Sequence, residues 1–191
     1  GSGKRAYLSP ILDCAGEVIS YAVSESQDLS MISAMLDDIR KDTIHEGTVF
    51  HSDQGALYMS DQFQERLKEM GLIQSMSRRG NCWDNAAMES FFGHLKDHCH
   101  FAGCATFQEV KKMIDDYIEY YNNERPQWTR LKMTPAAYAR YLKEMGEQEF
   151  KAYLAKERKK YEQMITRSIE RTDKHGEHLR SVISSLVEET R

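Results

Sequence analysis

The stretch "VFHSDQGALY", residues 49–58, places polar side chains directly after a short β-forming run. Val49 and Phe50 favour a strand, and the histidine, aspartate and glycine that follow are typical of the point where a strand ends. In α/β proteins functional side chains gather at such strand ends. Asp53 could equally close an ordinary polar turn. His51 could orient the Asp53 carboxylate or a nucleophilic water, or be a simple polar residue at a strand end.

The flanking sequence alternates between strand and helix patterns. Residues 6–12 and 17–24 are separated by "DCAG" and predict an antiparallel hairpin, with a local break at Pro10 because proline has no backbone donor. Strands come first, followed by helices interleaved with short strands, which predicts an α/β layer structure. The further expected elements are a helix over 29–40, a strand over 48–50, a helix over 63–70 that ends at Gly71, a strand over 72–77, a helix capped by Asp84 or Asn85, a helix opened by a Thr106–Glu109 capping box and a short helix from Pro135.

Composition is that of a globular protein. The chain has 191 residues, of which 40% are hydrophobic, and it contains no apolar run long enough to cross a bilayer, so we expect a soluble protein. The formal net charge of −4 argues against a uniformly basic nucleic-acid-binding coat. The four cysteines are irregularly spaced, which favours free thiols in a reducing cytoplasm over a disulfide framework (Cys14, Cys82, Cys99, Cys104).

The composition changes near residue 143. Residues 1–142 carry the mixed strand and helix patterns, whereas residues 143–191 are rich in charge, free of proline and show only a thin apolar stripe. We therefore expect one α/β domain over 1–142 and a charged helical extension over 143–191, interrupted at Gly176. This extension could serve as an oligomerisation arm or a partner-binding helix, but it lacks the sustained heptads of a long coiled coil.

A second acidic candidate follows the opening stretch. Glu89 lies in the first turn of the helix expected within "DNAAMESFFGHLK", residues 84–96, and thirty-five residues separate it from Asp53. Carboxylates are favoured near helix N-termini for electrostatic reasons, so Glu89 alone would be unremarkable in its place. The pair together with its flanking residues is a more specific signal than either acid.

Four motifs resemble one known family. "HSDQGALY" (51–58), "SRRGNCWDNAAMESFFGHLK" (77–96), "YYNNERPQW" (120–128) and "KMTPAAY" (132–138) are similar to the catalytic core of bacterial insertion-sequence transposases of the IS-three type. The resemblance runs from about residue 5 to 142. It implies a ribonuclease H-like fold, shared with retroviral integrases, and a DNA transposase that cleaves and joins DNA strands.

The resemblance also implies a D,D(35)E active site that uses divalent metal. Asp53 would be its second acid and Glu89 its third, both catalytic and both ligands of Mg²⁺ or Mn²⁺, with two ions in the complete site. The first acid of the family lies on a strand before the hairpin, and that strand should already have ended where this chain begins with Gly1-Ser2-Gly3. These three residues could be the native turn between the two strands or an added segment. We therefore expect a core that lacks its first strand and is inactive as this fragment. Asp13 and Asp84 are weak substitutes, because a turn and a helix cap explain them.

Several side chains around Glu89 are candidates for contact with DNA. Basic and amide groups near the acids can bind phosphate, and an aromatic ring can stack on a base (Arg78, Arg79, Asn81, Trp83, Lys96). For the two arginines, solvated surface charge is an equally good interpretation. Trp83 could instead cover the core as a lid. No role is assigned from the sequence to Asn123, Arg125, Trp128 or Lys132. A zinc site at His94, His98, Cys99 and Cys104 is disfavoured, because only one ligand couple has helical spacing.

Partners follow from the resemblance. It implies transposon ends and target DNA as substrates, a homo-oligomer, a separate helix-turn-helix segment or subunit for DNA recognition, no membrane and a bacterial cytoplasmic location. The alternative is a catalytically dead transposase remnant that acts as a DNA- or protein-binding module.

Overall fold

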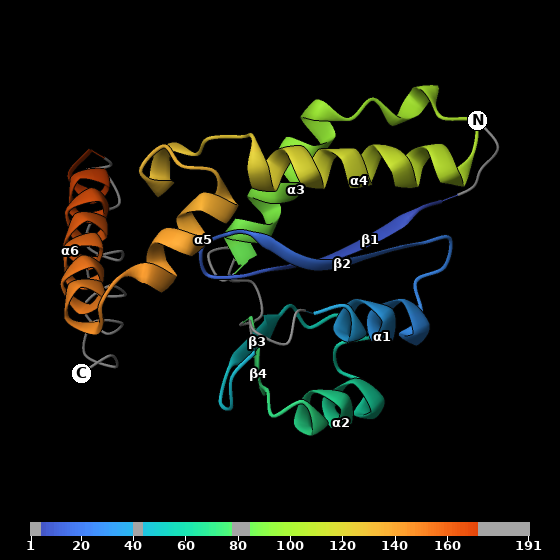
Figure 1. Cartoon of the computed structure of the whole chain (residues 1–191), viewed down its shortest axis with the longest axis horizontal. Helices are drawn as coiled ribbons and strands as arrows, with labels where there is room; N and C mark the ends of the chain where they lie inside the picture. The colour runs from blue at the N-terminus through green and yellow to red at the C-terminus, as the bar shows by residue number, and fades with distance from the viewer. Residues whose placement is uncertain (1–4, 40–43, 78–84, 172–191) are drawn as a thin grey trace. The chain divides into compact units, whose positions relative to one another are not determined.

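The computed structural model describes residues 5–39, 44–77 and 85–171 (Figure 1). Its contacts divide the chain into two compact units, Gly1–Tyr141 and Leu142–Arg191, which are described separately. The first unit contains every strand of the described chain. The described part of the second unit is mainly helical.

The predicted hairpin is present. Strand β1 (Tyr7–Leu12) pairs antiparallel with β2 (Val18–Ser24), and the turn between them is closed by the Asp13 carboxylate, which accepts from the Glu17 N–H at 2.8 Å. The expected break at Pro10 is wrong in position. Pro10 stays in register opposite Tyr21, and the irregularity falls between Ile11 and Leu12. An edge strand tolerates proline where the missing N–H faces away from its partner.

A second sheet contains the opening stretch. Strand β3 (Val49–Ser52) pairs parallel with β4 (Ile73–Met76), and helix α2 (Asp61–Glu69) connects them. The Ser60 side chain caps α2 at its start. Gly71 follows the helix with φ +71°, the left-handed conformation that glycine adopts without a steric penalty. The crossover therefore returns the chain in the direction that parallel pairing requires.

Helix α1 (Leu29–Asp37) joins the two sheets in one core. The Asp28 side chain caps it by accepting from the Met31 N–H at 3.1 Å. Within the described residues the two sheets share no strand pairing, yet both contribute to the same apolar cluster around α1. This cluster combines buried residues of α1 and α2 with partly buried residues of the hairpin and β3 (Ile32, Met35, Leu36, Phe63, Leu67, Ile11, Ile19, Phe50).

The other face of the hairpin is covered by α3 (Ala86–His98) and α4 (Phe107–Asn123). Figure 1 shows β1 and β2 between these helices and α1. The predicted Thr106–Glu109 capping box begins α4 as expected. Successive strand side chains alternate between the faces, so Leu8 and Leu12 pack toward α3 and α4, while Ile11 packs toward α1.

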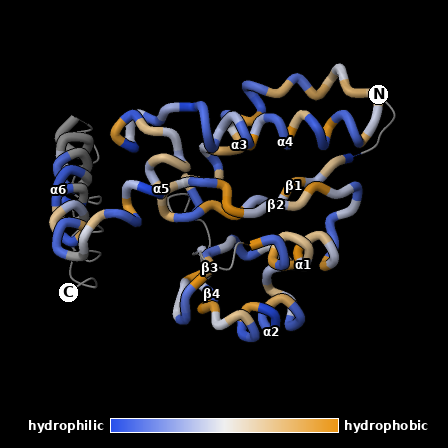
Figure 2. Tube along the Cα trace, in the orientation of Figure 1, coloured by the Kyte–Doolittle hydropathy of each residue, from blue (hydrophilic) through white to orange (hydrophobic). Residues whose placement is uncertain are grey.

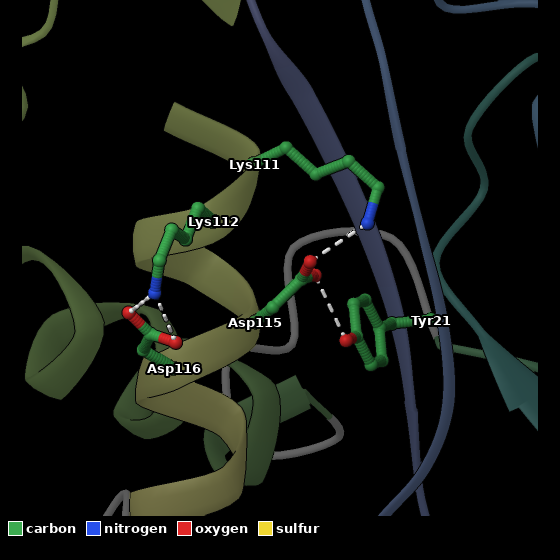
Figure 3. Close-up of polar contacts among 5 residues, drawn as sticks. All are labelled: Tyr21, Lys111, Lys112, Asp115 and Asp116. Atoms are coloured by element: carbon green, nitrogen blue, oxygen red, sulfur yellow. Dashed lines mark hydrogen bonds and ion pairs between the residues drawn. The ribbon is translucent and has the colours of Figure 1, made fainter. Parts of the chain in front are cut away.

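Polar contacts fix α4 against β2. The Asn122 side chain bonds both the N–H and the carbonyl of Val18 at 2.9 Å. Figure 3 shows Tyr21 of β2 donating to the Asp115 carboxylate, which also pairs with Lys111, while Lys112 pairs with Asp116 nearby. Burial and the bond to Asp115 raise the pKa of Tyr21 to about 12. Tyr21 thus remains a neutral donor at physiological pH.

Two further helices complete the described chain. A short turn of 3-10 helix, η4 (Trp128–Arg130), precedes α5 (Pro135–Glu144), whose first turn is capped by Thr134 as predicted. The expected C-terminal helical extension is present as α6 (Glu147–Arg171), which Figure 2 colours as largely hydrophilic. Gly176 lies outside the described residues. None of the described helices is long and apolar enough to span a membrane.

Candidate active site

The two acids predicted from the sequence line one cavity. This cavity has a volume of about 530 Å³ and lies in the first unit between strand β1, the end of β3 and the first turns of α3. Asp53 and Glu89 are both exposed to it, together with Lys96. Two carboxylates and one ammonium group are therefore its charged side chains within the described part of the chain.

Asp53 directly follows β3 and its carboxylate is held by the next turn. The Gly55 N–H donates to Asp53 Oδ1 at 2.9 Å. A Cβ atom added at Gly55 would lie 2.9 Å from the same oxygen, so only a glycine leaves this carboxylate its place. The turn and the active-site interpretations of Asp53 are therefore compatible, because the turn fixes the side chain at the rim of the cavity.

Glu89 is presented by one face of α3. Residues 85, 88, 89, 92, 93 and 96 follow helical spacing and line the cavity, whereas Phe91 and Leu95 on the opposite face are buried in the core. This burial sets the rotation of the helix and turns Glu89 and Lys96 toward Asp53. Asn85 is the N-cap residue of α3, but its side chain makes no capping hydrogen bond, and Asp84 lies outside the described residues.

His51 is held by serines rather than by Asp53. Its Nδ1 and Nε2 lie 3.0 Å from the hydroxyls of Ser75 and Ser77 respectively. Ser75 stands opposite His51 in the parallel register of β3 and β4. With both ring nitrogens engaged, His51 is a fixed polar side chain in the cavity wall. This agrees with its interpretation as a simple polar residue at a strand end.

Tyr58 and Ser9 support the cavity next to Asp53, and the sequence reasoning missed both. The Tyr58 and Ser9 hydroxyls lie 2.9 Å apart, and Ser9 also donates to the Met35 sulfur at 3.1 Å. Burial raises the pKa of Tyr58, the bond to Ser9 opposes that rise, and the charge of Asp53 adds to it. A tyrosine five residues after a strand-end aspartate carries no distinctive sequence signal, because only the approach of β1 creates this contact.

The remaining residues considered from the sequence lie elsewhere or outside the described ranges. Arg78, Arg79, Asn81 and Trp83 lie outside the described residues. Asp13 closes the hairpin turn, where burial raises its pKa, and is not in the cavity wall. His98 stacks on Tyr120 with ring centroids 4.9 Å apart. Within the described ranges no three His, Cys, Asp or Glu side chains are grouped so that they could hold a metal ion.

Comparison with known proteins places this geometry in a family. Two family profiles, both described as integrase core domain, match residues 1–82 and 70–135. The InsK transposase of insertion sequence element IS150 from Escherichia coli K12 is 44% identical over 140 residues, which cover 72% of this chain and 50% of that protein. A transposase-like protein of Haemophilus influenzae is 40% identical, over 70% of this chain and 63% of its own length.

Solved structures agree on the fold. A chain from the structure of the simian T-cell lymphotropic virus intasome in complex with the PP2A regulatory subunit B56 gamma superposes with a TM-score of 0.59 at 17% identity, covering 72% of this chain and 49% of that chain. The HTLV-2 integrase catalytic core in complex with magnesium gives a TM-score of 0.50 at 14% identity, covering 70% and 92%. The first unit thus has the ribonuclease H-like integrase core fold. Residues 1–135 carry the integrase core domain, and the relatives that the chain resembles are insertion-sequence transposases. The chain spans half the length of the IS150 relative.

The link between Asp53 and Tyr58 can be tested by titration. We expect Asp53→Asn to lower the pKa of Tyr58, because loss of the neighbouring negative charge makes the phenolate less unfavourable. The measurement is the ring ¹³C shift of labelled tyrosines through the alkaline range, assigned with Tyr58→Phe. Asp61→Asn, which removes an exposed carboxylate from α2, should leave the pKa of Tyr58 in place. Equal titration curves for wild type and Asp53→Asn would contradict the described geometry.

Proposed function

We propose that this chain is the catalytic core of a DNA transposase, which cleaves DNA strands and joins them to target DNA with the help of a divalent cation. The observation that supports the proposal is the shared cavity of Asp53 and Glu89, with Lys96 beside them. Two carboxylates from a strand end and a facing helix are among the groups that such chemistry requires, and an adjacent ammonium group suits a phosphate.

The donor set fits a hard cation. Asp53 and Glu89 offer carboxylate oxygens only, and Mg²⁺ is commonly held by one or two carboxylates together with waters and substrate phosphates. A bound Mg²⁺ would stabilise the charge that develops on the phosphate under attack. The described residues supply ligands for one ion in this way. The second ion that we propose for the complete family site needs a further carboxylate.

The chain's own residues would divide the remaining work. Gly55 holds the Asp53 carboxylate through its N–H, and Tyr58 with Ser9 fills the space behind it. Lys96 would bind a phosphate oxygen of the DNA strand as a point charge. We assign Arg78, Arg79, Asn81 and Trp83 to the same DNA contact on the basis of the family resemblance. Transposon ends and target DNA are the proposed substrates, with a homo-oligomer, a helix-turn-helix segment elsewhere and the bacterial cytoplasm as the setting.

A second candidate function is a binding module that has lost its chemistry. It is favoured by one observation, since no third acid joins Asp53 and Glu89 in the described part of the cavity. In this case the cavity would keep its shape but would hold a cation weakly or not at all. The Mn²⁺ titrations and the strand-transfer assay described below distinguish the two candidate functions.

Metal binding should depend on both acids. We expect Asp53→Asn and Glu89→Gln each to weaken Mn²⁺ binding roughly tenfold or more, measured by calorimetric titration, because each removes one anionic ligand. Asp61→Asn is the matched control, since it removes an exposed carboxylate of α2 outside the cavity, and its affinity should equal that of the wild type. Mn²⁺ affinity that survives loss of either cavity acid would exclude the proposed site.

A methyl group at Gly55 should disturb the same site without removing a ligand. In Gly55→Ala the added carbon would lie 2.9 Å from Asp53 Oδ1, so the carboxylate must move. We expect weaker Mn²⁺ binding with both acids still present. Gly93→Ala provides the control, because a Cβ at Gly93 meets nothing within 4 Å. A Gly55→Ala protein that binds Mn²⁺ as tightly as Gly93→Ala would show that the turn does not position Asp53.

Strand transfer should be absent from the 191-residue chain on its own. Two carboxylates cannot hold the pair of ions that stabilises both the attacking and the leaving oxygen. The assay joins labelled oligonucleotide ends to plasmid DNA in Mg²⁺ or Mn²⁺ and resolves the products by gel electrophoresis. Joined products that disappear in Glu89→Gln would refute the expected inactivity and would favour a complete enzyme over the binding module.

A further inference from the structure

One exposed aromatic side chain belongs to no part of the site described above. Trp128 lies in the loop between α4 and α5 with 82% of its surface accessible, and Leu131 in the same loop is 52% exposed. We call residues 124–133 the tryptophan loop. Tryptophan is among the residues with the largest apolar surface and is highly buried on average, so two neighbouring apolar side chains this exposed, one of them tryptophan, make the loop a candidate contact surface.

The tryptophan loop is held by hydrogen bonds at both ends. The Gln127 N–H donates to the Met133 carbonyl at 2.9 Å, which closes an antiparallel bridge, and the Lys132 N–H donates to the Gln127 carbonyl at 3.1 Å. The Arg130 guanidinium donates to the Ala15 carbonyl in the β1–β2 turn and to the Gln127 side chain. The loop is therefore anchored to the body of the first unit, and the exposure of Trp128 does not come from a loose chain.

The backbone of the loop is also strained. Leu131 and Lys132 follow one another with φ +54° and +61°, in the left-handed region that side chains with a Cβ disfavour. Such residues persist where the surroundings enforce them, and they concentrate at sites that bind or react. Here the enforced turn returns Lys132 toward Trp128, so that its Nζ lies 4.6 Å from the centre of the indole ring.

The charged residues of the tryptophan loop indicate the kind of ligand. Arg125, Arg130 and Lys132 lie within the tryptophan loop and Glu124 is its only acid, although the whole chain has a net charge of −4. Of these cations, Lys132 lies against the ring, and an exposed indole with an ammonium group beside it is complementary to a base with a neighbouring phosphate.

We propose that the tryptophan loop binds an unpaired nucleotide of a DNA strand, with the base stacked on the indole of Trp128 and a neighbouring phosphate held by Lys132. This inference builds on the proposed function, in which DNA is the substrate, and it adds a site for a single-stranded part of that substrate. Base stacking on an aromatic ring is tolerant of sequence, so the loop would bind a frayed or displaced strand whatever its bases.

The test measures binding of the full chain to fluorescently labelled oligothymidylate and to the matching duplex, by anisotropy in EDTA. We expect Trp128→Ala to weaken binding to the single strand about tenfold, Trp128→Phe to retain most of the affinity, and the duplex to show little change. Lys132→Gln should reduce the salt dependence of binding by about one phosphate contact. Met59→Ala and Lys68→Gln are matched controls, because both side chains are exposed elsewhere on the first unit.

Two results would overturn the proposal. The first is a Trp128→Ala protein that binds the single strand as tightly as Met59→Ala. The second is a Trp128→Ala protein that loses self-association in sedimentation while its affinity for DNA is unchanged, which would make the loop a protein interface. EDTA keeps the measurement independent of the acids. A chain that binds no Mn²⁺ but stacks the oligonucleotide would count against the catalytic proposal alone, and one that binds Mn²⁺ without stacking would count against the loop alone.

Discussion

The first unit depends on the buried face of α1, because its two sheets share no ladder hydrogen bonds within the described residues. Met35 is fully buried between them. Its carbonyl accepts from Ser20 of β2 at 2.5 Å and its sulfur accepts from Ser9 of β1 at 3.1 Å. Burying a side chain such as Leu36 or Met35 contributes about 1.5 to 3 kcal/mol. The separation of β1 and β3, and with it the width of the cavity, follows from how α1 and α2 pack.

The packing of the core also determines the positions of Asp53 and Glu89, through the elements that carry them. Asp53 is fixed by the end of β3, whose apolar Phe50 packs against Phe63 of α2 with ring centroids 5.6 Å apart. Glu89 is fixed by Phe91, which is 1% exposed and meets Tyr121 of α4 edge to face at 5.1 Å. Neither acid takes part in the core itself. Each is exposed on an element whose opposite face is buried, so the core decides the site geometry without competing for its charges.

Sequence patterns predicted the features that depend on neighbours along the chain. The hairpin, the Thr106–Glu109 capping box and Thr134 before Pro135 are local, and the structure contains all three. The irregularity near Leu12 was misplaced, since the pairing with β2 rather than the proline decides where the ladder slips. Of the two predicted caps of α3, Asn85 makes no side-chain cap, because this residue takes φ −119° and ψ +11° instead of an extended conformation, and Asp84 lies outside the described residues.

Contacts between distant segments could not be read in the same way. His51 meets Ser75 and Ser77 through the register of a parallel pair, and Tyr58 meets Ser9 across forty-nine positions. Neither contact produces a periodic pattern in the sequence. The two acids were proposed as site residues because the residues around them form extended family motifs, whereas the serine and tyrosine beside them are common residues in ordinary positions. Arg130 likewise reaches Ala15 only because α4 ends next to the hairpin turn.

The unpaired sides of strands β1 and β3 have a consequence for handling the protein. The cavity wall contains residues of β1 and β3. Within the described residues each of these strands pairs on one side only, so its other side keeps a row of amide and carbonyl groups without a strand partner. Such a row is a template for any extended polypeptide, including another copy of this chain. Pro10 and the four-residue length of β3 shorten the template. Concentrated samples remain open to association through the backbone, which added salt does not screen as it screens surface charge.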